Sequence, residues 1–152
     1  MAHPMDDDEV VAFLGALPAR TGKLATVRPD GRPHVAPIWY ALDPSTRGPG
    51  SPIGDLVVNT DADSVKGRNL RHDPRVALCV DDDRPPFTFV TIEGVATIGE
   101  DPGELLRWAT VIGGRYMGAD QAETYGARNG VPGELVVRIR PTRVVAVSGL
   151  AD

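Results

Sequence analysis

The spacing of apolar and polar positions along the chain predicts a fold made mostly of strands, with helices between some of them. Near the start, four apolar residues recur at helical spacing behind an acidic run, which predicts a helix over Asp6 to Leu17. Later helices are expected to begin at Asp101-Pro102 and run through Ile112, and to cover Asp120 to Arg128. Strand-like runs cover Lys23 to Arg28, His34 to Leu42, Asp55 to Thr60, Arg75 to Val80, Phe87 to Ile98, Glu134 to Arg140 and Arg143 to Ser148. Roughly seven strands with short connections fit a mainly β fold, a small barrel with peripheral helices, better than a parallel sheet.

Glycine and proline add detail to this outline. Pro29-Asp30-Gly31 is a strong hairpin signal, so the strands on either side of it are expected to be antiparallel neighbours. Pro37 cannot donate to a ladder and predicts an edge, a bulge or a position open to a ligand. Gly94 predicts a bulge or the close approach of another backbone, and Pro141 is expected to divide the closing pair of strands. The Gly-, Pro- and Ser-rich stretch Asp43 to Gly54 reads as a loop.

Length and charge narrow the class of protein. The 152 residues are the usual size of one domain, so residues 1–152 are expected to form a single domain, with 41% hydrophobic residues supplying its core. The chain lacks an apolar run of the roughly 20 residues that a membrane span needs, and its N-terminus does not resemble a signal peptide. These two features predict a cytoplasmic protein with no membrane partner. A net charge of -5 argues against a nucleic-acid binder. The single cysteine, Cys79, lies in an apolar run and is expected to be buried and inert.

The stretch Leu56 to Arg75 carries the strongest candidate chemistry. It reads as a buried strand that leads into a short helix bearing Lys66, one of only two lysines beside fourteen arginines. Free N–H groups and the positive end of the helix dipole favour a phosphate at such a helix start, and a lysine can reach the same anion. A solvated helix with internal ion pairs to the flanking Asp61, Asp63 and Asp73 fits the same residues, so both interpretations stay open.

Other kinds of site find little support. The histidines His3, His34 and His72 are scattered, which predicts no metal site, and neither Ser64 nor Ser148 lies in a nucleophile elbow. The glycine-rich run Gly113 to Gly118 follows a predicted helix, where a phosphate loop would precede one, and reads as a helix end and turn.

Three segments carry a resemblance to a known family. They are Thr26 to Trp39 (TVRPDGRPHVAPIW), Leu56 to Thr60 (LVVNT) followed by KGRNL at Lys66 and DPRV at Asp73, and the later section Glu104 to Gly133 with RYMG and NGVPG. Together they resemble the split β-barrel flavin and deazaflavin oxidoreductases related to pyridoxamine 5'-phosphate oxidase. Within that superfamily the chain is most similar to the branch that uses the deazaflavin coenzyme F-420.

This resemblance implies a homodimer of FMN-binding-type split barrels with two cofactor sites between the protomers. Its implied ring-contacting strand is Val35, Ala36, Pro37, Ile38 and Trp39, and its implied phosphate-holding segment is Asn59, Thr60, Ser64 and Lys66, with Arg68 and Asn69 as further candidates. For Trp39 and Tyr40, a core or interface role competes with ring contact, whereas Trp108, Tyr116 and Tyr125 are expected to pack helices, with Tyr116 near the substrate entrance.

The implied activity is hydride transfer from reduced F-420 to a small unsaturated or quinone-like acceptor, with no catalytic side chain required because the cofactor carries the chemistry. An FMN-dependent oxidoreductase on the same fold and a non-catalytic cofactor- or ligand-binding protein are the alternatives. Oxidation of pyridoxamine phosphate itself is disfavoured, because the C-terminal residues lack the Arg-x-His ending associated with that substrate.

Overall fold

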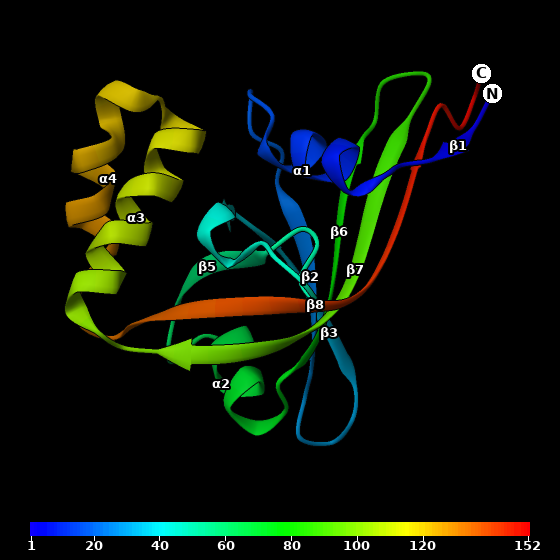
Figure 1. Cartoon of the computed structure of the whole chain (residues 1–152). Helices are drawn as coiled ribbons and strands as arrows, with labels where there is room; N and C mark the ends of the chain where they lie inside the picture. The colour runs from blue at the N-terminus through cyan, green and yellow to red at the C-terminus, as the bar shows by residue number, and fades with distance from the viewer.

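The computed structural model describes all 152 residues and is built on one antiparallel sheet whose strands follow the order β3-β2-β6-β7-β8-β5-β4, with β1 paired to β8 (Figure 1). The strands are β1 (His3–Pro4), β2 (Gly22–Val27), β3 (Pro33–Ile38), β4 (Ala41–Asp43), β5 (Asp55–Asp61), β6 (Arg75–Asp82), β7 (Thr88–Gly99) and β8 (Glu134–Ser148). The helices are α1 (Asp7–Gly15), α2 (Val65–His72), α3 (Pro102–Met117) and α4 (Ala122–Asn129), with short 3-10 turns at Pro44–Thr46 and Ala119–Gln121. The mainly β architecture with peripheral helices is therefore confirmed.

The first hairpin forms as its turn residues predict. Strands β2 and β3 are antiparallel, with Ala25 opposite Val35, and Gly31 in the connecting turn has a φ of 88°. Strand β3 is at the end of the strand order, where a residue without a backbone N–H is tolerated. The expectation of an edge at Pro37 is confirmed.

The predicted strand over His34 to Leu42 is two strands. Strand β3 ends at Ile38, and β4 begins at Ala41 on the opposite edge of the strand order, so Trp39 and Tyr40 carry the chain from one edge to the other. Tyr40 is buried at this crossover, and its hydroxyl donates to the Leu14 carbonyl at 2.8 Å. The barrel is split at this point, because β3 and β4 do not pair with each other.

The predicted break at Pro141 is wrong. Strand β8 runs continuously from Glu134 to Ser148, and Pro141 lies opposite Gly94 at the one register shift between β7 and β8. A Cβ on Gly94 would lie 2.8 Å from the Arg140 carbonyl oxygen, so only glycine permits this close approach. The bulge predicted at Gly94 is confirmed. It places Pro141, which has no N–H, at the register shift, so the β7–β8 hydrogen-bond ladder continues on both sides of it.

Nineteen buried residues form the main core inside the barrel, and α1 and α2 each pack against it. Helix α1 opens with a capping box between Asp6 and Glu9, contributes Val10 and Leu14 to the core, and ends two residues before the predicted Leu17, which is exposed. Cys79 is half-buried rather than fully buried.

Helices α3 and α4 form a hairpin beside the barrel, on the left in Figure 1. A second core of six buried residues holds this hairpin against the outer face of the sheet: Ala41, Val57, Leu105, Trp108, Ile112 and Val136. Helix α3 ends before Gly118, whose φ is 104°, as the glycine-rich run predicts, although Gly113 and Gly114 lie within the helix and let α4 approach closely. None of the helices combines the length and apolar character that crossing a bilayer requires.

Candidate functional site

A cavity of about 490 Å³ lies between the split edge of the barrel and the α3–α4 hairpin. The barrel contributes residues from β3, β5, α2 and β8, and the hairpin closes the other side. The lining consists of Thr21, Pro37, Ile38, Trp39, Asn59, Thr60, Asp61, Lys66, Ala109, Ile112, Asn129 and Glu134. Residues distant in the sequence therefore meet in one space of the size that small-molecule ligands occupy.

Trp39 forms a fixed aromatic wall of this cavity. Its ring stacks on Tyr116 of α3 with centroids 4.9 Å apart and planes 2° apart, and Tyr125 of α4 lies 6.4 Å away. The Tyr116 hydroxyl donates to the Arg20 carbonyl at 2.7 Å and accepts from the Tyr40 N–H at 3.2 Å. Burial raises the pKa of Tyr116, so this hydroxyl stays protonated and can donate. Trp39 thus both packs a helix and faces the cavity, whereas Tyr40 belongs to the core.

Asn59 brings an unsatisfied polar group to the cavity. The strand β5 places it among the lining residues, and both its Nδ2 and its Oδ1 are buried without a hydrogen-bond partner. A buried polar group left unpaired costs about 1–3 kcal/mol, and an amide offers both donor and acceptor to a ligand. Asn59 is therefore the lining residue that most requires a polar ligand.

Lys66 lies at the start of α2, where the chain turns out of β5. Ser64 caps the helix, because its Oγ accepts from the Gly67 N–H at 3.0 Å and donates to the Asp61 carbonyl at 2.7 Å. The N–H groups of Val65 and Lys66 have no acceptor in the chain. No carboxylate lies within 4.0 Å of the Lys66 ammonium, in contrast to Lys23, whose Nζ contacts Asp81 at 3.0 Å.

Asp61 and Glu134 add negative charge to the cavity. They are direct partners in the antiparallel pairing of β5 and β8. Burial raises the pKa of Glu134, the neighbouring Asp61 raises it further, and Lys66 opposes both. Two carboxylates beside one ammonium give the lining a formal charge of -1 when all three are ionised.

The structure separates the eleven predicted site residues into two groups. Six of them line the cavity: Pro37, Ile38, Trp39, Asn59, Thr60 and Lys66. The other five lie outside its lining: Val35, Ala36, Ser64, Arg68 and Asn69. Val35 is 67% exposed on the edge strand, and Asn69 is buried with its Nδ2 donating to Thr26 Oγ1 at 3.0 Å, which ties α2 to β2.

Sequence reasoning did not select Asp61 or Glu134 as site residues, nor the hairpin residues Ala109, Ile112 and Asn129. Only the strand register brings Glu134 to Asp61, and no local motif marks it.

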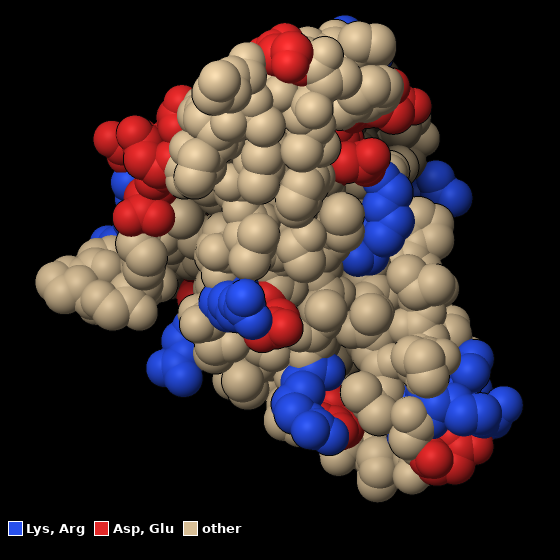
Figure 2. Space-filling view, turned by 90° about the vertical axis from the view of Figure 1, so that its right-hand side faces the viewer, with Lys and Arg blue, Asp and Glu red and all other residues tan.

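Nine of the sixteen lysine and arginine side chains make ion pairs with carboxylates. Figure 2 shows Lys and Arg side chains lying beside Asp and Glu, with uncharged surface between these groups. Three arginines pair with an aspartate two positions before them in the sequence: Arg32 with Asp30, Arg75 with Asp73, and Arg84 with Asp82. Lys66 has no such carboxylate partner within 4.0 Å.

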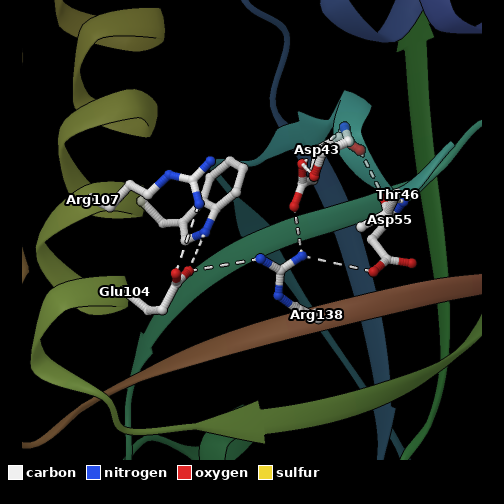
Figure 3. Close-up of polar contacts among 8 residues, drawn as sticks. Asp43, Thr46, Asp55, Glu104, Arg107 and Arg138 are labelled. Carbon is white, nitrogen blue, oxygen red and sulfur yellow. Dashed lines mark hydrogen bonds and ion pairs between the residues drawn. The ribbon is translucent and has the colours of Figure 1, made fainter.

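An arginine-centred network attaches the hairpin to the barrel (Figure 3). Arg138 of β8 contacts Asp43 at 2.8 Å, Asp55 at 3.7 Å and Glu104 of α3 at 3.7 Å. Glu104 also accepts from the Trp108 indole N–H at 2.8 Å. The network therefore positions α3, the helix that supplies Ala109 and Ile112 to the cavity.

The two aspartates of this network respond differently to burial. Burial raises the pKa of Asp43, but hydrogen bonds from Ser45 and Arg138 outweigh it and hold that pKa below its ordinary value. Burial raises the pKa of Asp55, where the opposing charge of Arg138 is too weak to reverse it and Asp43 adds to the rise. Arg138 is thus the charge on which both carboxylates depend.

Known proteins with similar sequences and structures show which family the chain belongs to. A conserved hypothetical protein of Mycobacterium tuberculosis has 32% identity over 93% of this chain and 84% of its own, with a TM-score of 0.77. An F-420 reductase has 26% identity over 82% of this chain and 88% of its own, with a TM-score of 0.58. The heme storage protein HutZ of Vibrio cholerae shares the fold. It has 20% identity over 88% of this chain and 90% of its own, with a TM-score of 0.65. The family model for pyridoxamine 5'-phosphate oxidase matches residues 6–148, so the chain belongs to the pyridoxamine 5'-phosphate oxidase family.

Proposed function

We propose that this protein is a coenzyme F-420-dependent reductase that transfers hydride to a small unsaturated or quinone-like acceptor. The observation that carries the proposal is the cavity that joins the unpartnered amide of Asn59 to the unpaired ammonium of Lys66 beside Trp39. The similarity to an F-420 reductase over most of both chains supports the choice of cofactor.

The lining residues fit a flavin-like cofactor. Asn59 would satisfy its amide against the polar ring edge or side chain of the cofactor, and Lys66 with the free N–H groups at the start of α2 would hold a phosphate. Pro37 to Trp39 offer an edge-strand backbone and an aromatic surface. The bound reduced cofactor supplies the hydride, and the protein positions the acceptor and excludes water.

The carboxylates of Asp61 and Glu134 weaken the attraction of this cavity for anions. Lys66 offsets one of the two negative charges, so the phosphate depends strongly on that one side chain. This gives Lys66 more influence on binding than a lysine in a basic patch would have.

The proposal includes a homodimer. Val35 on edge strand β3 is exposed, lies two residues before the cavity residue Pro37, and is available to a second copy of the chain. Sedimentation velocity of the purified protein is expected to give twice the 16.2 kDa of the chain. A species of monomer mass at all concentrations would contradict it.

Lys66→Ala is expected to weaken F-420 binding by about 1–3 kcal/mol, the cost of losing a charged hydrogen bond to a buried partner. This corresponds to roughly a 5- to 150-fold rise in Kd. The measurement is calorimetric or fluorescence titration of wild type and variant with F-420 and FMN in one buffer.

Lys23→Ala is the matched control, because Lys23 is the only other lysine, pairs with Asp81 and is not itself a residue of the cavity lining. Its affinity for F-420 should equal that of the wild type. Tighter binding of FMN than of F-420 would transfer the proposal to the FMN-dependent alternative. Selective F-420 binding without reduction of any quinone or enone acceptor would favour a binding protein.

A further inference from the structure

Three charged side chains surround the position proposed for the cofactor phosphate. Asp61 and Glu134 lie opposite each other in the β5–β8 ladder, and Lys66 is the second residue of α2, the helix that follows β5. These three residues are the charged members of the cavity lining. Asp61 and Lys66 both act on the pKa of Glu134, in opposite directions, so the three groups lie close enough to interact.

The two carboxylates bring negative charge to a place that also attracts anions. Asp61 Oδ1 accepts from the Asp63 N–H at 2.7 Å, and the Glu134 carboxylate makes no side-chain hydrogen bond with the rest of the chain. The attraction comes from the Lys66 ammonium and from the free N–H groups of Val65 and Lys66. One full positive charge therefore stands against two negative ones, where a site built for a highly charged anion would gather cations.

The charge on a phosphate decides how strongly such carboxylates oppose it. A phosphate monoester carries about -1.5 to -2 at pH 7, because its second pKa is about 6. A phosphodiester keeps a single negative charge. Coulomb energy is proportional to the product of the two charges, so at equal distance a carboxylate opposes a dianion twice as strongly as a monoanion. F-420 carries its phosphate as a diester, whereas FMN ends in a monoester.

We propose that Asp61 and Glu134 determine cofactor specificity by selecting a singly charged phosphodiester over a phosphomonoester at the start of α2. The inference rests on the proposed function and deepens it, because it names the residues that separate F-420 from FMN. Lys66 and the helix start attract either phosphate, and the two carboxylates cancel the advantage that a second negative charge would bring. Neither carboxylate takes part in the chemistry of the reduction.

Three ligands with the same ring and different phosphate charge test this selection. They are the phosphate-free deazaflavin alcohol of F-420, its 5'-phosphate, and the methyl ester of that phosphate. At pH 8 the phosphate position of these ligands is uncharged, doubly charged and singly charged, respectively. Fluorescence titration of the apoprotein gives the Kd of each ligand for wild type, Glu134→Gln and Asp61→Asn. The Asn side chain keeps an oxygen that can accept from the Asp63 N–H.

Glu134→Gln is expected to lower the Kd of the methyl ester by roughly threefold and that of the 5'-phosphate by roughly tenfold, because doubling the ligand charge squares the factor. Asp61→Asn should act in the same direction. The Kd of the phosphate-free alcohol should not change in either variant. Glu93→Gln is the matched control, because it removes the same charge from an exposed strand residue outside the cavity lining. It should leave all three Kd values unchanged.

Equal gains for the ester and the 5'-phosphate, or a gain for the phosphate-free alcohol, would overturn the proposed selection. F-420 itself, titrated in the same series, tests the proposed function separately. If the charge-dependent gains appear and F-420 does not bind, the selection stands and the proposed function is wrong. If F-420 binds and the gains are absent, the selection is wrong and the proposed function stands. If the wild type binds none of the four ligands, both are wrong.

Discussion

Arg138→Ala is expected to lower the free energy of unfolding by about 3 kcal/mol, because it leaves buried carboxylates without their counter-charge. The Asp43 side chain is 4% exposed and the Asp55 side chain 18%, and both contact the Arg138 guanidinium. The substitution also removes the guanidinium that lies over the Trp108 ring, with 5.4 Å to the ring centroid. Urea unfolding at pH 7, followed by circular dichroism, measures the change.

The loss of unfolding free energy in Arg138→Ala should depend on pH. Without Arg138, the pKa values of Asp43 and Asp55 rise in the folded state, because only the Ser45 hydrogen bonds then oppose burial at Asp43 and only the charge of Arg140 opposes it at Asp55. A carboxyl group whose folded pKa lies above its unfolded value contributes stability at low pH and loses it as pH rises through the folded pKa. The difference between wild type and variant is therefore expected to be smaller near pH 4 than at pH 7.

Arg107→Ala is the control for this network. Arg107 contacts the same Glu104 at 3.7 Å, but its side chain is 57% exposed, and exposed ion pairs contribute about 0–1 kcal/mol. Figure 3 shows Arg107 and Arg138 approaching Glu104 from different sides. Equal losses in the two variants would show that burial of the aspartates is not the cause.

Gly67→Ala is expected to disturb both stability and cofactor binding, because the residue packs tightly against backbone. A Cβ at this position would lie 2.4 Å from the Asp61 carbonyl oxygen and 3.0 Å from that of Ala62. These backbone atoms cannot yield as a flexible side chain would, so the start of α2 must shift, at a cost of about 1–3 kcal/mol. For a domain of this size, each kcal/mol lowers Tm by roughly 2–4 °C.

The same shift moves Lys66, the neighbour of Gly67. If Lys66 holds the cofactor phosphate as proposed, Gly67→Ala should weaken F-420 binding by at least roughly tenfold, about 1.4 kcal/mol. Gly15→Ala is the control, since a Cβ there meets nothing within 4 Å at the end of α1, and it should leave Tm unchanged or slightly higher. Unchanged Tm and affinity in Gly67→Ala would contradict the expected displacement.

Short-range patterns predicted much of this fold correctly. The turn at Pro29-Asp30-Gly31, the edge at Pro37, the bulge at Gly94 and the helix beginning after Asp101 all depend on the conformations available to a few adjacent residues. The continuous apolar runs at the centre of β5 and the start of β8 have a tertiary cause instead: these strands are buried on both faces, by the barrel core and by the hairpin.

The sequence by itself determined most of the strands, most of the turns and the segment around Lys66, because these follow from local conformational preference and the alternation of side chains. The composition of the cavity was decided only by the tertiary structure. Glu134 meets Asp61 through strand register, Asn69 is turned toward Thr26 instead of the cavity, and the α3–α4 hairpin closes the space. Alternation shows that two neighbouring side chains point to opposite faces, but which face becomes a ligand site depends on what packs against it from elsewhere in the chain.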